Sequence, residues 1–437
     1  MKSVGIDIGT TTISIVVVEQ TEGKVIEAKT LQNGSFVYSQ NEWERIQDVS
    51  MIIQKVMDAL EEIRKHHCDI RFIGLTGQMH GILYLDKKGQ CVSPLYTWQD
   101  GRGNLIMKET GKTLVDWIYD ICGVKGATGY GLITHIYNSR YKLVPEEAVS
   151  FCTIADYLGM LLVGRKIPLL HVSNAASLGF FDVSRKCFRE EELRKIGINE
   201  EFLPQITENI EILGEYHNIP VGVAIGDNQA SFLGTVGTQD GGILLNMGTG
   251  GQISVLSKAY FEEQGIEARP FLNGTYLLVG ASLCGGRAYA VLEHFLRSYA
   301  VAAGAEDRSQ YEFMEQLAAE VNGENDIMEI NTVFSGTRTN PKERGCITNI
   351  SEDNFTPGNM IYGFLKGMVK ELYDMYVKIE IGTGIQVKRL IASGNGFRKN
   401  KTLQKISSEM FQARLELVTY EEEAAVGAAL SVREYIR

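Results

Sequence analysis

Two short stretches of this chain share one pattern and lie close to half the chain apart. "IDIGTTTIS" begins at Ile6, and "LNMGTGGQIS" begins at Leu245. Each is typical of a strand, a Gly-Thr turn of small residues, and a second strand that opens with Ile-Ser, with one residue inserted in the second stretch. A duplication at matching places predicts two similar domains, each presenting one hairpin turn to a shared cleft.

The segments around these hairpins predict an α/β fold. "KVIEAKT" predicts a third strand, the apolar spacing of "EWERIQDVSMIIQKVMDALEEIRKH" predicts a helix over 42–66, and "IRFIGLTG" predicts a further strand. This β-β-β-α-β order differs from the simple alternation of a dinucleotide fold. Helices are also expected at 105–121 and 155–163, and "PVGVAIGDNQ" predicts a strand that ends in Gly-Asp-Asn.

Length and charge narrow the class of protein. The 437 residues exceed the usual size of one core, and we place two domains at 1–232 and 233–437. The net charge of −11 argues against nucleic acid as a partner, which would need clustered Lys and Arg. We expect no membrane partner, because no run of 18 or more apolar residues occurs and "MKSVGIDIG" lacks a signal-peptide pattern. Seven scattered cysteines without a C-x-x-C pair predict a cytoplasmic location.

The two turns have the composition of phosphate-binding loops. Backbone N–H groups and hydroxyls of Gly, Thr and Ser can converge there on an anion. The standard motifs are absent, since Ile106 stands where a Walker loop ending in Gly111-Lys112-Thr113 needs a glycine. We expect that "GKT" to lie on a helix surface. Likewise, Gly394-x-Gly396 is not completed to a G-x-G-x-x-G.

Two aspartates are candidates for the chemistry. Asp7 precedes the first turn, where a carboxylate can bind a Mg²⁺ that bridges nucleotide phosphates; the alternative is a cap for its own turn. Asp227 follows an apolar strand, where it could accept the proton of a hydroxyl that attacks a γ-phosphoryl group. Its alternative is the N-cap of the following helix. The second phosphate-type loop favours the metal for Asp7.

Six motifs in order resemble those of the FGGY family of carbohydrate kinases: "GIDIGTTTIS", "GQMHG", "WQDGR", "GDNQA", "NMGTGGQIS" and "ASGNGFRKN". The resemblance runs from the first strand to "EEEAAVGAAL" near the end of the chain. It implies a two-domain actin-like ATPase fold, of the ribonuclease H-like kind, with an interdomain cleft. It also implies ATP and Mg²⁺ as cofactors and a sugar as substrate, and it is compatible with a homodimer.

The resemblance further implies a role for each matching residue. Asp227 would be the general base and would hold Mg²⁺ together with Asp7. The sugar site would comprise Gln78, Met79, His80, Trp98, Gln99, Asp100 and Asn228. The nucleotide phosphates would meet Gly9, Thr10, Thr11 and Thr12 and, from the other domain, Gly248, Thr249, Gly250 and Gly251. Gly394, Asn395, Gly396 and Arg398 would border the adenosine. Polar residues of this kind suit a polyhydroxylated ligand, whose hydroxyls each donate and accept.

Within the family, "PLYTWQDGRG", "VSNAASLGFFD" and "FSGTRTNPKERGCITNIS" are most similar to members that phosphorylate sedoheptulose at its terminal hydroxyl, giving sedoheptulose 7-phosphate. Cys284 departs from this pattern, which usually has Asn. A xylulose-type pentulose kinase is the alternative within the family, since "GQMHG" also occurs there. An actin-like ATPase without a sugar substrate is the alternative outside it. Arg102 is expected either to pair with Asp100 or to touch the substrate.

Overall fold

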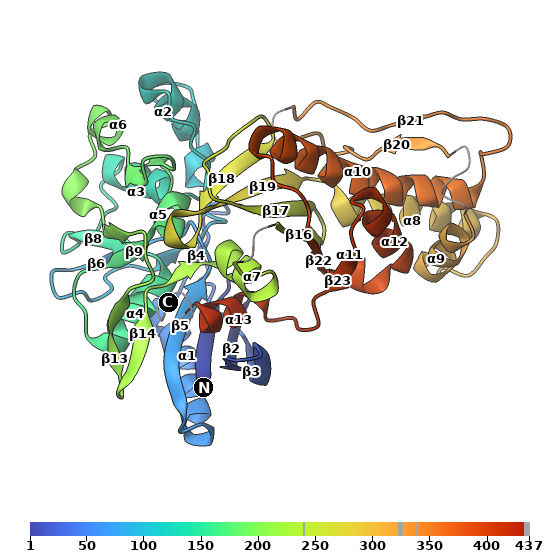
Figure 1. Ribbon diagram of the computed structural model, residues 1–437. Coiled ribbons are helices and arrows are strands. Elements are labelled where there is room, and N and C mark those ends of the chain that lie inside the picture. Colours follow the sequence, from blue (N-terminus) through green and yellow to red (C-terminus); the bar gives the residue numbers. More distant parts are fainter. Residues whose placement is uncertain (239–240, 322–326, 338–339, 432–437) are drawn as a thin grey trace. The chain divides into compact units, whose positions relative to one another are not determined.

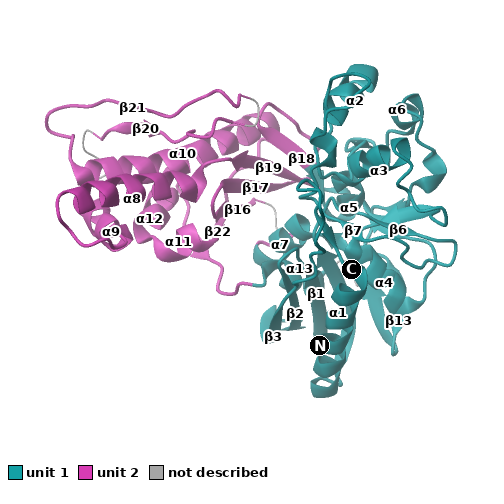
Figure 2. Cartoon of the chain, turned by 180° about the vertical axis from the view of Figure 1, so that it is seen from behind, with its two compact units in different colours: residues 1–235, 269–275, 422–437 teal, residues 236–268, 276–421 magenta. Residues whose placement is uncertain are grey.

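The computed structural model describes residues 1–238, 241–321, 327–337 and 340–431. The chain forms two compact units, which Figure 2 shows in different colours. Unit 1 comprises Met1–Thr235, Arg269–Thr275 and Glu422–Arg437, and unit 2 comprises Val236–Ala268 and Tyr276–Glu421. Because two later segments return to unit 1, the continuous domains 1–232 and 233–437 stay a prediction.

The sheet of unit 1 has the strand order β13-β14-β5-β1-β2-β3, and β15 also pairs with β5 (Figure 1). The strands are β1 (Lys2–Ile8), β2 (Thr12–Glu19), β3 (Lys24–Gln32), β5 (Ile70–Gly77), β13 (Ile212–Tyr216), β14 (Ile219–Gly222) and β15 (Ile225–Gly226). β1 is antiparallel to β2 and parallel to β5, and β15 is parallel to β5. The carboxyl ends of β1, β5 and β15 therefore lie at one edge of the sheet.

The sheet of unit 2 has the order β18-β19-β17-β16-β22-β23. Its strands are β16 (Gly242–Met247), β17 (Gly251–Ser257), β18 (Ile266–Pro270), β19 (Tyr276–Ser282), β22 (Arg389–Ser393) and β23 (Leu415–Leu417). β16 is antiparallel to β17 and parallel to β22, as β1 is to β2 and β5. The duplication predicted from the hairpins is thus present as a shared strand order.

The two hairpins differ in register at the turn. Asp7 lies opposite Ser14 in the first hairpin, whereas Asn246, at the matching position of the second hairpin, lies opposite Gln252. Ile8 pairs with Ile13 and Met247 pairs with Gly251, so the second turn is shorter in its pairing, although its sequence up to Ile-Ser is one residue longer. The second Ile-Ser therefore lies further along its strand than the first.

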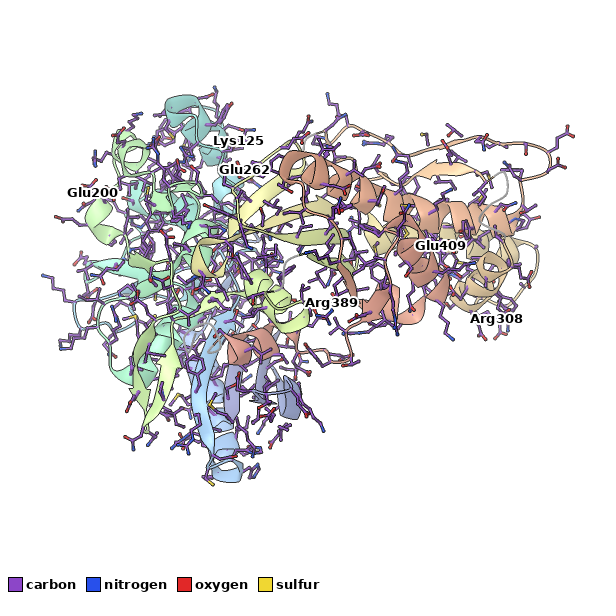
Figure 3. All side chains as sticks on the ribbon, in the orientation of Figure 1. Lys125, Glu200, Glu262, Arg308, Arg389 and Glu409 are labelled. Carbon is purple, nitrogen blue, oxygen red and sulfur yellow. The ribbon has the colours of Figure 1, made fainter. Side chains whose placement is uncertain are left out.

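Helices cover the two sheets. Those of unit 1 are α1 (Val49–His66), α2 (Leu114–Cys122), α3 (Gly131–Arg140), α4 (Ile154–Val163), α5 (Val172–Ser177), α6 (Glu190–Lys195), α7 (Asp227–Thr235) and α13 (Glu423–Leu430). Those of unit 2 are α8 (Gly285–Ala302), α9 (Tyr311–Ala319), α10 (Pro357–Thr383), α11 (Asn395–Lys399) and α12 (Lys401–Met410). Charged side chains such as Lys125, Glu262 and Arg308 are exposed (Figure 3), whereas apolar residues of β1 and β2 are buried.

Short strands complete the fold outside the two main sheets. They are β4 (Ile46–Gln47), β6 (Leu83–Leu85), β7 (Leu95–Tyr96), β8 (Ser150–Cys152), β9 (Leu169–His171), β10 (Phe181–Asp182), β11 (Cys187–Phe188), β12 (Gln205–Thr207), β20 (Glu329–Asn331) and β21 (Cys346–Thr348). All but β20 and β21 belong to unit 1.

Two helices begin later than the sequence predicted. The helix expected over 42–66 begins at Val49, because the Asp48 carboxylate accepts the Met51 N–H and caps it. The helix expected over 105–121 begins at Leu114, capped by Thr113. Gly111-Lys112 therefore precede that helix and do not lie on its surface. The helix expected over 155–163 is confirmed as α4.

Close backbone packing holds α13 and α7 in unit 1. A Cβ atom at Gly427 of α13 would lie 1.7 Å from the carbonyl oxygen of Ala230 in α7. A Cβ atom at Gly5 of β1 would lie 1.8 Å from the carbonyl oxygen of Ala425. Only glycine fits such separations. Helix α13 therefore packs both against α7, which begins with Asp227, and against β1, which contains Asp7.

Candidate functional site

The strand register of unit 1 gathers three predicted site segments at one sheet edge. Asp7 of β1 pairs with Thr76 of β5, and Gly77 pairs with Gly226 of β15. The chain leaves this edge through the Gly-Thr turn after β1 and the Gln-Met-His loop after β5. Asp227 follows directly after β15. The three parallel strands thus bring the predicted metal, sugar and base residues together.

The negative charge of Asp227 affects the ionisation of Asp7 at this edge. Burial raises the pKa of Asp7 to about 7, and the negative charge of Asp227 raises it further. Burial also raises the pKa of Asp227 to about 6, which the Asn228 N–H and the positive charge of Arg269 oppose. Arg269 Nη1 also donates to Asn228 Oδ1 at 3.1 Å. The edge therefore concentrates negative charge beside one arginine.

The donor set at this edge suits a hard cation. Asp7 Oδ1 is buried and accepts no hydrogen bond within the part of the chain that the structure describes. A carboxylate oxygen without a hydrogen-bond partner is available to act as a ligand of Mg²⁺. Over the same residues, no cluster of three His, Cys, Asp or Glu side chains could hold a metal.

His80 is held in one orientation by its neighbours. Its φ of 72° is uncommon for a residue other than glycine. Its backbone N–H donates to Ser177 Oγ at 3.1 Å, and its Nδ1 donates to the Ser177 carbonyl at 2.6 Å. The ring stacks on Tyr130 with centroids 4.7 Å apart. Strained backbone that the surroundings enforce is typical of ligand loops.

A hydrogen-bond network joins the first turn to the loop of His80. Thr10 Oγ1 donates to Gln78 Oε1 at 3.2 Å, and Gln78 Nε2 donates to Gln47 Oε1 at 2.8 Å. Gln47 Nε2 in turn donates to the Thr10 carbonyl oxygen at 2.9 Å. Trp98, whose surface is 48% exposed, donates from Nε1 to Thr10 Oγ1 at 2.9 Å. Phosphate-type turn and predicted sugar loop are thus one connected structure.

Met79 packs beneath the candidate base. It is buried, and a Cβ atom at Gly226 would lie 2.8 Å from its Sδ. Its observed contact is therefore with the strand that leads to Asp227. Its predicted contact with a sugar stays a prediction.

The structure gives Arg102 the first of its two expected roles. Arg102 and Asp100 are both buried, and Asp100 Oδ1 accepts from Arg102 Nε at 2.6 Å. Asp100 Oδ2 accepts from Arg102 Nη2 and from the Arg45 N–H. The guanidinium also lies 4.4 Å from the Tyr96 ring centroid. Asp100 therefore forms a buried ion pair, while its neighbour Gln99 is exposed. Sugar binding by both stays a prediction.

The predicted nucleotide residues of unit 2 gather at the edge where β16 and β22 end. Gly394 has a φ of 88°, and a Cβ atom there would lie 2.7 Å from the Met247 carbonyl oxygen. Gly396 packs on Met247 in the same way. Arg398 Nη2 donates to the Tyr420 carbonyl at 2.8 Å. Glycine thus allows the loop of residues 394–396 to lie against the end of β16.

The beginning of α8 supports the second turn. The Gly286 N–H donates to the Gly248 carbonyl, and the Arg287 N–H donates to the Thr249 carbonyl, both at 2.9 Å. A Cβ atom at Gly285 would lie 2.5 Å from the Gly250 backbone. The glycines of "GASLCGGRA" therefore serve close contact with the hairpin, and Cys284 beside them is buried.

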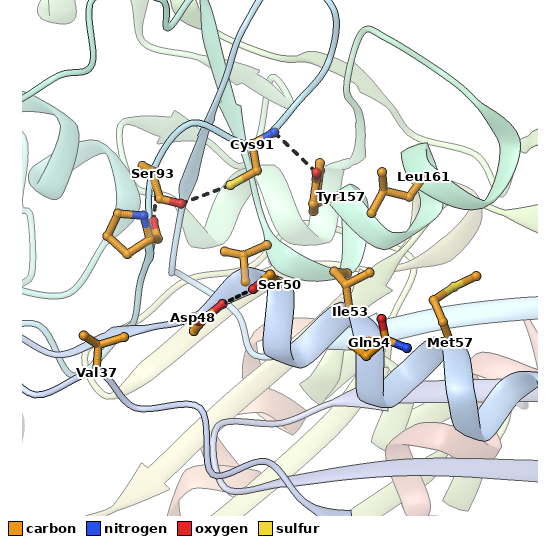
Figure 4. A pocket seen from close by; sticks show the side chains of 12 residues that line it. Val37, Asp48, Ser50, Ile53, Gln54, Met57, Cys91, Ser93, Tyr157 and Leu161 are labelled. Carbon is orange, nitrogen blue, oxygen red and sulfur yellow. Dashed lines mark hydrogen bonds between the residues drawn. The ribbon is translucent and has the colours of Figure 1, made fainter.

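A separate cavity of about 580 Å³ lies beside the start of α1 (Figure 4). Its lining includes Asp48, Ile53, Cys91, Tyr157 and Leu161. It contains none of the predicted site residues. The sheet edges described above, and not this cavity, carry the candidate chemistry.

Several residues that build the site were not predicted. Gln47, Ser173, Ser177 and Arg269 each bond to a predicted residue or its strand. "SNAAS" contributed to the resemblance, but no residue in it received a role. Gln47 lies 31 positions from Gln78, so no local spacing could have indicated their contact.

Comparison with known proteins identifies the class to which the fold and site belong. The model of the FGGY family of carbohydrate kinases matches residues 3–234 with its N-terminal domain and residues 243–431 with its C-terminal domain. The chain therefore belongs to the FGGY family of carbohydrate kinases, as its motifs predicted. Kinases of this family use ATP and act on a sugar substrate.

The curated relatives include kinases of several sugars. "Sedoheptulokinase" of Homo sapiens is 29% identical over 88% of this chain and 86% of its own length. The Mus musculus protein of the same name is 28% identical over 98% of this chain and 96% of its own length. "Xylulose kinase" of Staphylococcus xylosus is 23% identical over 98% of this chain and 89% of its own length.

Solved structures confirm the predicted two-domain actin-like fold. The xylulose kinase from Rhodospirillum rubrum has a TM-score of 0.82 at 21% identity, covering 99% of this chain and 89% of that one. Plasmodium falciparum glycerol kinase with ADP has a TM-score of 0.77 at 19% identity, and the match covers 99% of this chain and 90% of that one. Across the residues that the structure describes, every helix is too short or too polar to cross a membrane.

Proposed function

We propose that this carbohydrate kinase transfers phosphate from ATP to the terminal hydroxyl of sedoheptulose, giving sedoheptulose 7-phosphate. The observation that carries a kinase reaction here is the convergence of Asp7, the His80 loop and Asp227 at one sheet edge. The choice of sugar is supported by the two relatives named sedoheptulokinase, whose matches span 88% and 98% of the chain.

In this proposal Asp227 accepts the proton of the attacking hydroxyl. A pKa of about 6 leaves most of the carboxylate ionised at neutral pH, yet brings its basicity nearer to the working pH than an ordinary aspartate has. Arg269, which bonds Asn228, limits the rise in pKa and helps to keep Asp227 charged.

Asp7 would hold Mg²⁺ through its orphaned oxygen, with Asp227 as the second protein carboxylate. When bound, the ion would neutralise charge on the phosphates of ATP. Asp7 must be ionised for this role, and its pKa of about 7 means that cation binding and deprotonation are coupled. The turn of Gly9–Thr12 would offer backbone N–H groups and hydroxyls to the phosphates.

The sugar would meet the polar residues around the His80 loop. We assign contacts with its hydroxyls to His80, Gln99 and Asn228, with the exposed Trp98 beside them. Gln78, Met79 and Asp100 complete the proposed set as buried neighbours. In unit 2, residues 248–251 would contact phosphates, and Gly394–Gly396 with Arg398 would contact the adenosine.

An ADP-release assay over a panel of sugars tests the substrate. Sedoheptulose, xylulose, ribulose and fructose are compared, with gluconate and glycerol added because relatives bear the names of those kinases. We expect the highest kcat/KM for sedoheptulose. Equal or better activity on xylulose would favour the pentulose kinase instead, which the xylulose kinase relative also supports.

We also propose a cytoplasmic location. All seven cysteines are free thiols, as is usual in a reducing compartment. Fractionation of cells that express the protein would check this location.

A further inference from the structure

The short helix α5 bonds to both halves of the proposed sugar and base site. At its end, Ser177 accepts the His80 N–H at Oγ and the His80 Nδ1–H at its carbonyl. Near its start, Ser173 Oγ accepts the Gly226 N–H at 2.9 Å. Asn174 Nδ2 donates to the Ala224 carbonyl at 3.2 Å. One buried turn of helix thus contacts the sugar loop and the strand that leads to Asp227.

A neutral histidine orients the Ser173 hydroxyl. His171 Nε2 lies 3.2 Å from the Glu208 carbonyl, which can only accept, so Nε2 carries the hydrogen. His171 Nδ1 must then accept from the Ser173 hydroxyl at 2.8 Å. The Ser173 oxygen is left to accept the Gly226 N–H. Burial lowers the pKa of His171 to about 4, which agrees with the neutral ring that this chain of bonds requires.

Asn174 is anchored from its other side. Its Nδ2 also lies 3.4 Å from Asp156 Oδ1 on α4, and Thr153 Oγ1 donates to Asp156 Oδ2 at 2.6 Å. All three side chains are buried. The carbonyl of Ala224 is therefore bound by an amide that cannot rotate freely.

We propose that α5 positions the sugar loop and the base relative to one another, with Ser173 and Asn174 acting on Asp227 and Ser177 acting on His80. The inference rests on the proposed function, because it takes Asp227 as the base and His80 as a sugar ligand. Gly226 directly precedes Asp227, so loss of its acceptor lets the carboxylate shift. A misplacement of about 1 Å can cost roughly 10²-fold in rate.

Two matched variants separate the two ends of α5. Ser173→Ala is expected to lower kcat by roughly 10- to 100-fold while the KM for the ketose changes about 2-fold or less. Ser177→Ala is expected to raise that KM about 10-fold with a smaller change in kcat. Ser3→Ala is the control, because Ser3 is equally buried and donates to the Ala429 carbonyl at 2.8 Å, away from the site. It should lower Tm similarly without either kinetic change.

The outcomes distinguish this inference from the proposed function. Equal kinetic changes in Ser173→Ala and Ser177→Ala, or changes no larger than those of Ser3→Ala, overturn the positioning role. Full turnover of Ser173→Ala beside a large loss in Asp227→Asn overturns it while leaving the base intact. Absence of ketose-dependent ADP release in the unmodified enzyme overturns the proposed function instead. If Ser173→Ala does not fold, Ser173→Thr decides, since a retained hydroxyl predicts a kcat close to the parent value and a larger loss contradicts it.

Discussion

The two sheet edges of this protein have the same strand order and different chemistry. In unit 1 the strand before the turn carries Asp7, whose pKa is raised to about 7 and whose Oδ1 has no partner among the described residues. In unit 2 the same strand position carries Asn246, whose Nδ2 donates to Ser393 Oγ at 2.8 Å. At this strand position among the described residues, the hairpin of unit 1 therefore carries a carboxylate with an unpaired oxygen, and the hairpin of unit 2 carries an amide that is hydrogen-bonded.

This difference indicates how the proposed chemistry is divided between the two units. A strained histidine, an orphaned oxygen and two interacting carboxylates in unit 1 are costly to stability, and such features concentrate at reactive sites. The predicted residues of unit 2 are mainly glycines whose backbones pack closely, as at Gly394 and Met247. We therefore infer that unit 1 carries the proton and metal chemistry, while unit 2 offers backbone to the nucleotide.

The largest effect is expected when the base is removed from unit 1. Asp227→Asn keeps the shape and removes the proton acceptor, so kcat should fall by roughly 10²- to 10⁴-fold. Ketose-dependent ADP release measures the loss, and an unchanged circular-dichroism spectrum serves as the control. Near-normal turnover with the same product would show that Asp227 is not the base.

The next effect comes from making unit 1 resemble unit 2. Asp7→Asn gives the first hairpin the amide of the second, and turnover should fall by roughly 10²-fold because the proposed cation ligand is lost. The Mg²⁺ concentration needed for half-maximal rate should rise. Normal Mg²⁺ dependence in this variant would remove Asp7 from the metal site.

The raised carboxyl pKa values predict how stability changes with pH. Asp7 and Asp227 bind protons more tightly in the folded chain than when unfolded, where the ordinary value is 3.8. The folded state therefore loses stability as pH rises from about 4 to about 7. Relative to the parent, the Tm of Asp7→Asn should increase by a few degrees over this window. A constant difference from pH 5 to pH 8 would contradict the raised pKa.

The smallest effect is expected from the reverse exchange. Asn246→Asp removes the N–H that Ser393 Oγ now accepts, so the hydroxyl must turn to donate instead, and desolvation of the half-buried charge should cost about 1–3 kcal/mol. The KM for ATP should rise, since the charge lies near the second phosphate loop, while kcat changes little. Thermal unfolding and ATP titration measure the two effects. An unchanged Tm together with tighter ATP binding would mean that the sheet edge of unit 2 accommodates a carboxylate as well as the edge of unit 1 does.

Much of the fold could be predicted because its signals are local. The hairpin of Gly9–Thr12, its copy in unit 2 and the apolar helix α4 follow from neighbouring residues. Helix starts were less accessible, since Asp48 caps α1 after a stretch whose apolar spacing already looked helical. For Ile46 the tertiary pairing in β4 outweighed that spacing.

The candidate site likewise has a part that local sequence predicts and a part that it does not. Asp7 and Asp227 could be singled out because a carboxylate after an apolar strand is visible in the sequence. The links that connect them to α5 could not, since Ser173 lies 53 positions from Gly226 and Ser177 lies 97 positions from His80. Serine is common, and only the fold shows which serines meet which loop.

The most direct test of the account is a single reaction followed to its product. The enzyme is incubated with ATP, Mg²⁺ and sedoheptulose, ADP release is measured with and without the sugar, and the phosphorylated carbon is identified by NMR. We predict strongly sugar-dependent ADP release and phosphate on the terminal carbon. ADP release that no sugar stimulates would contradict the account and favour an actin-like ATPase without a sugar substrate.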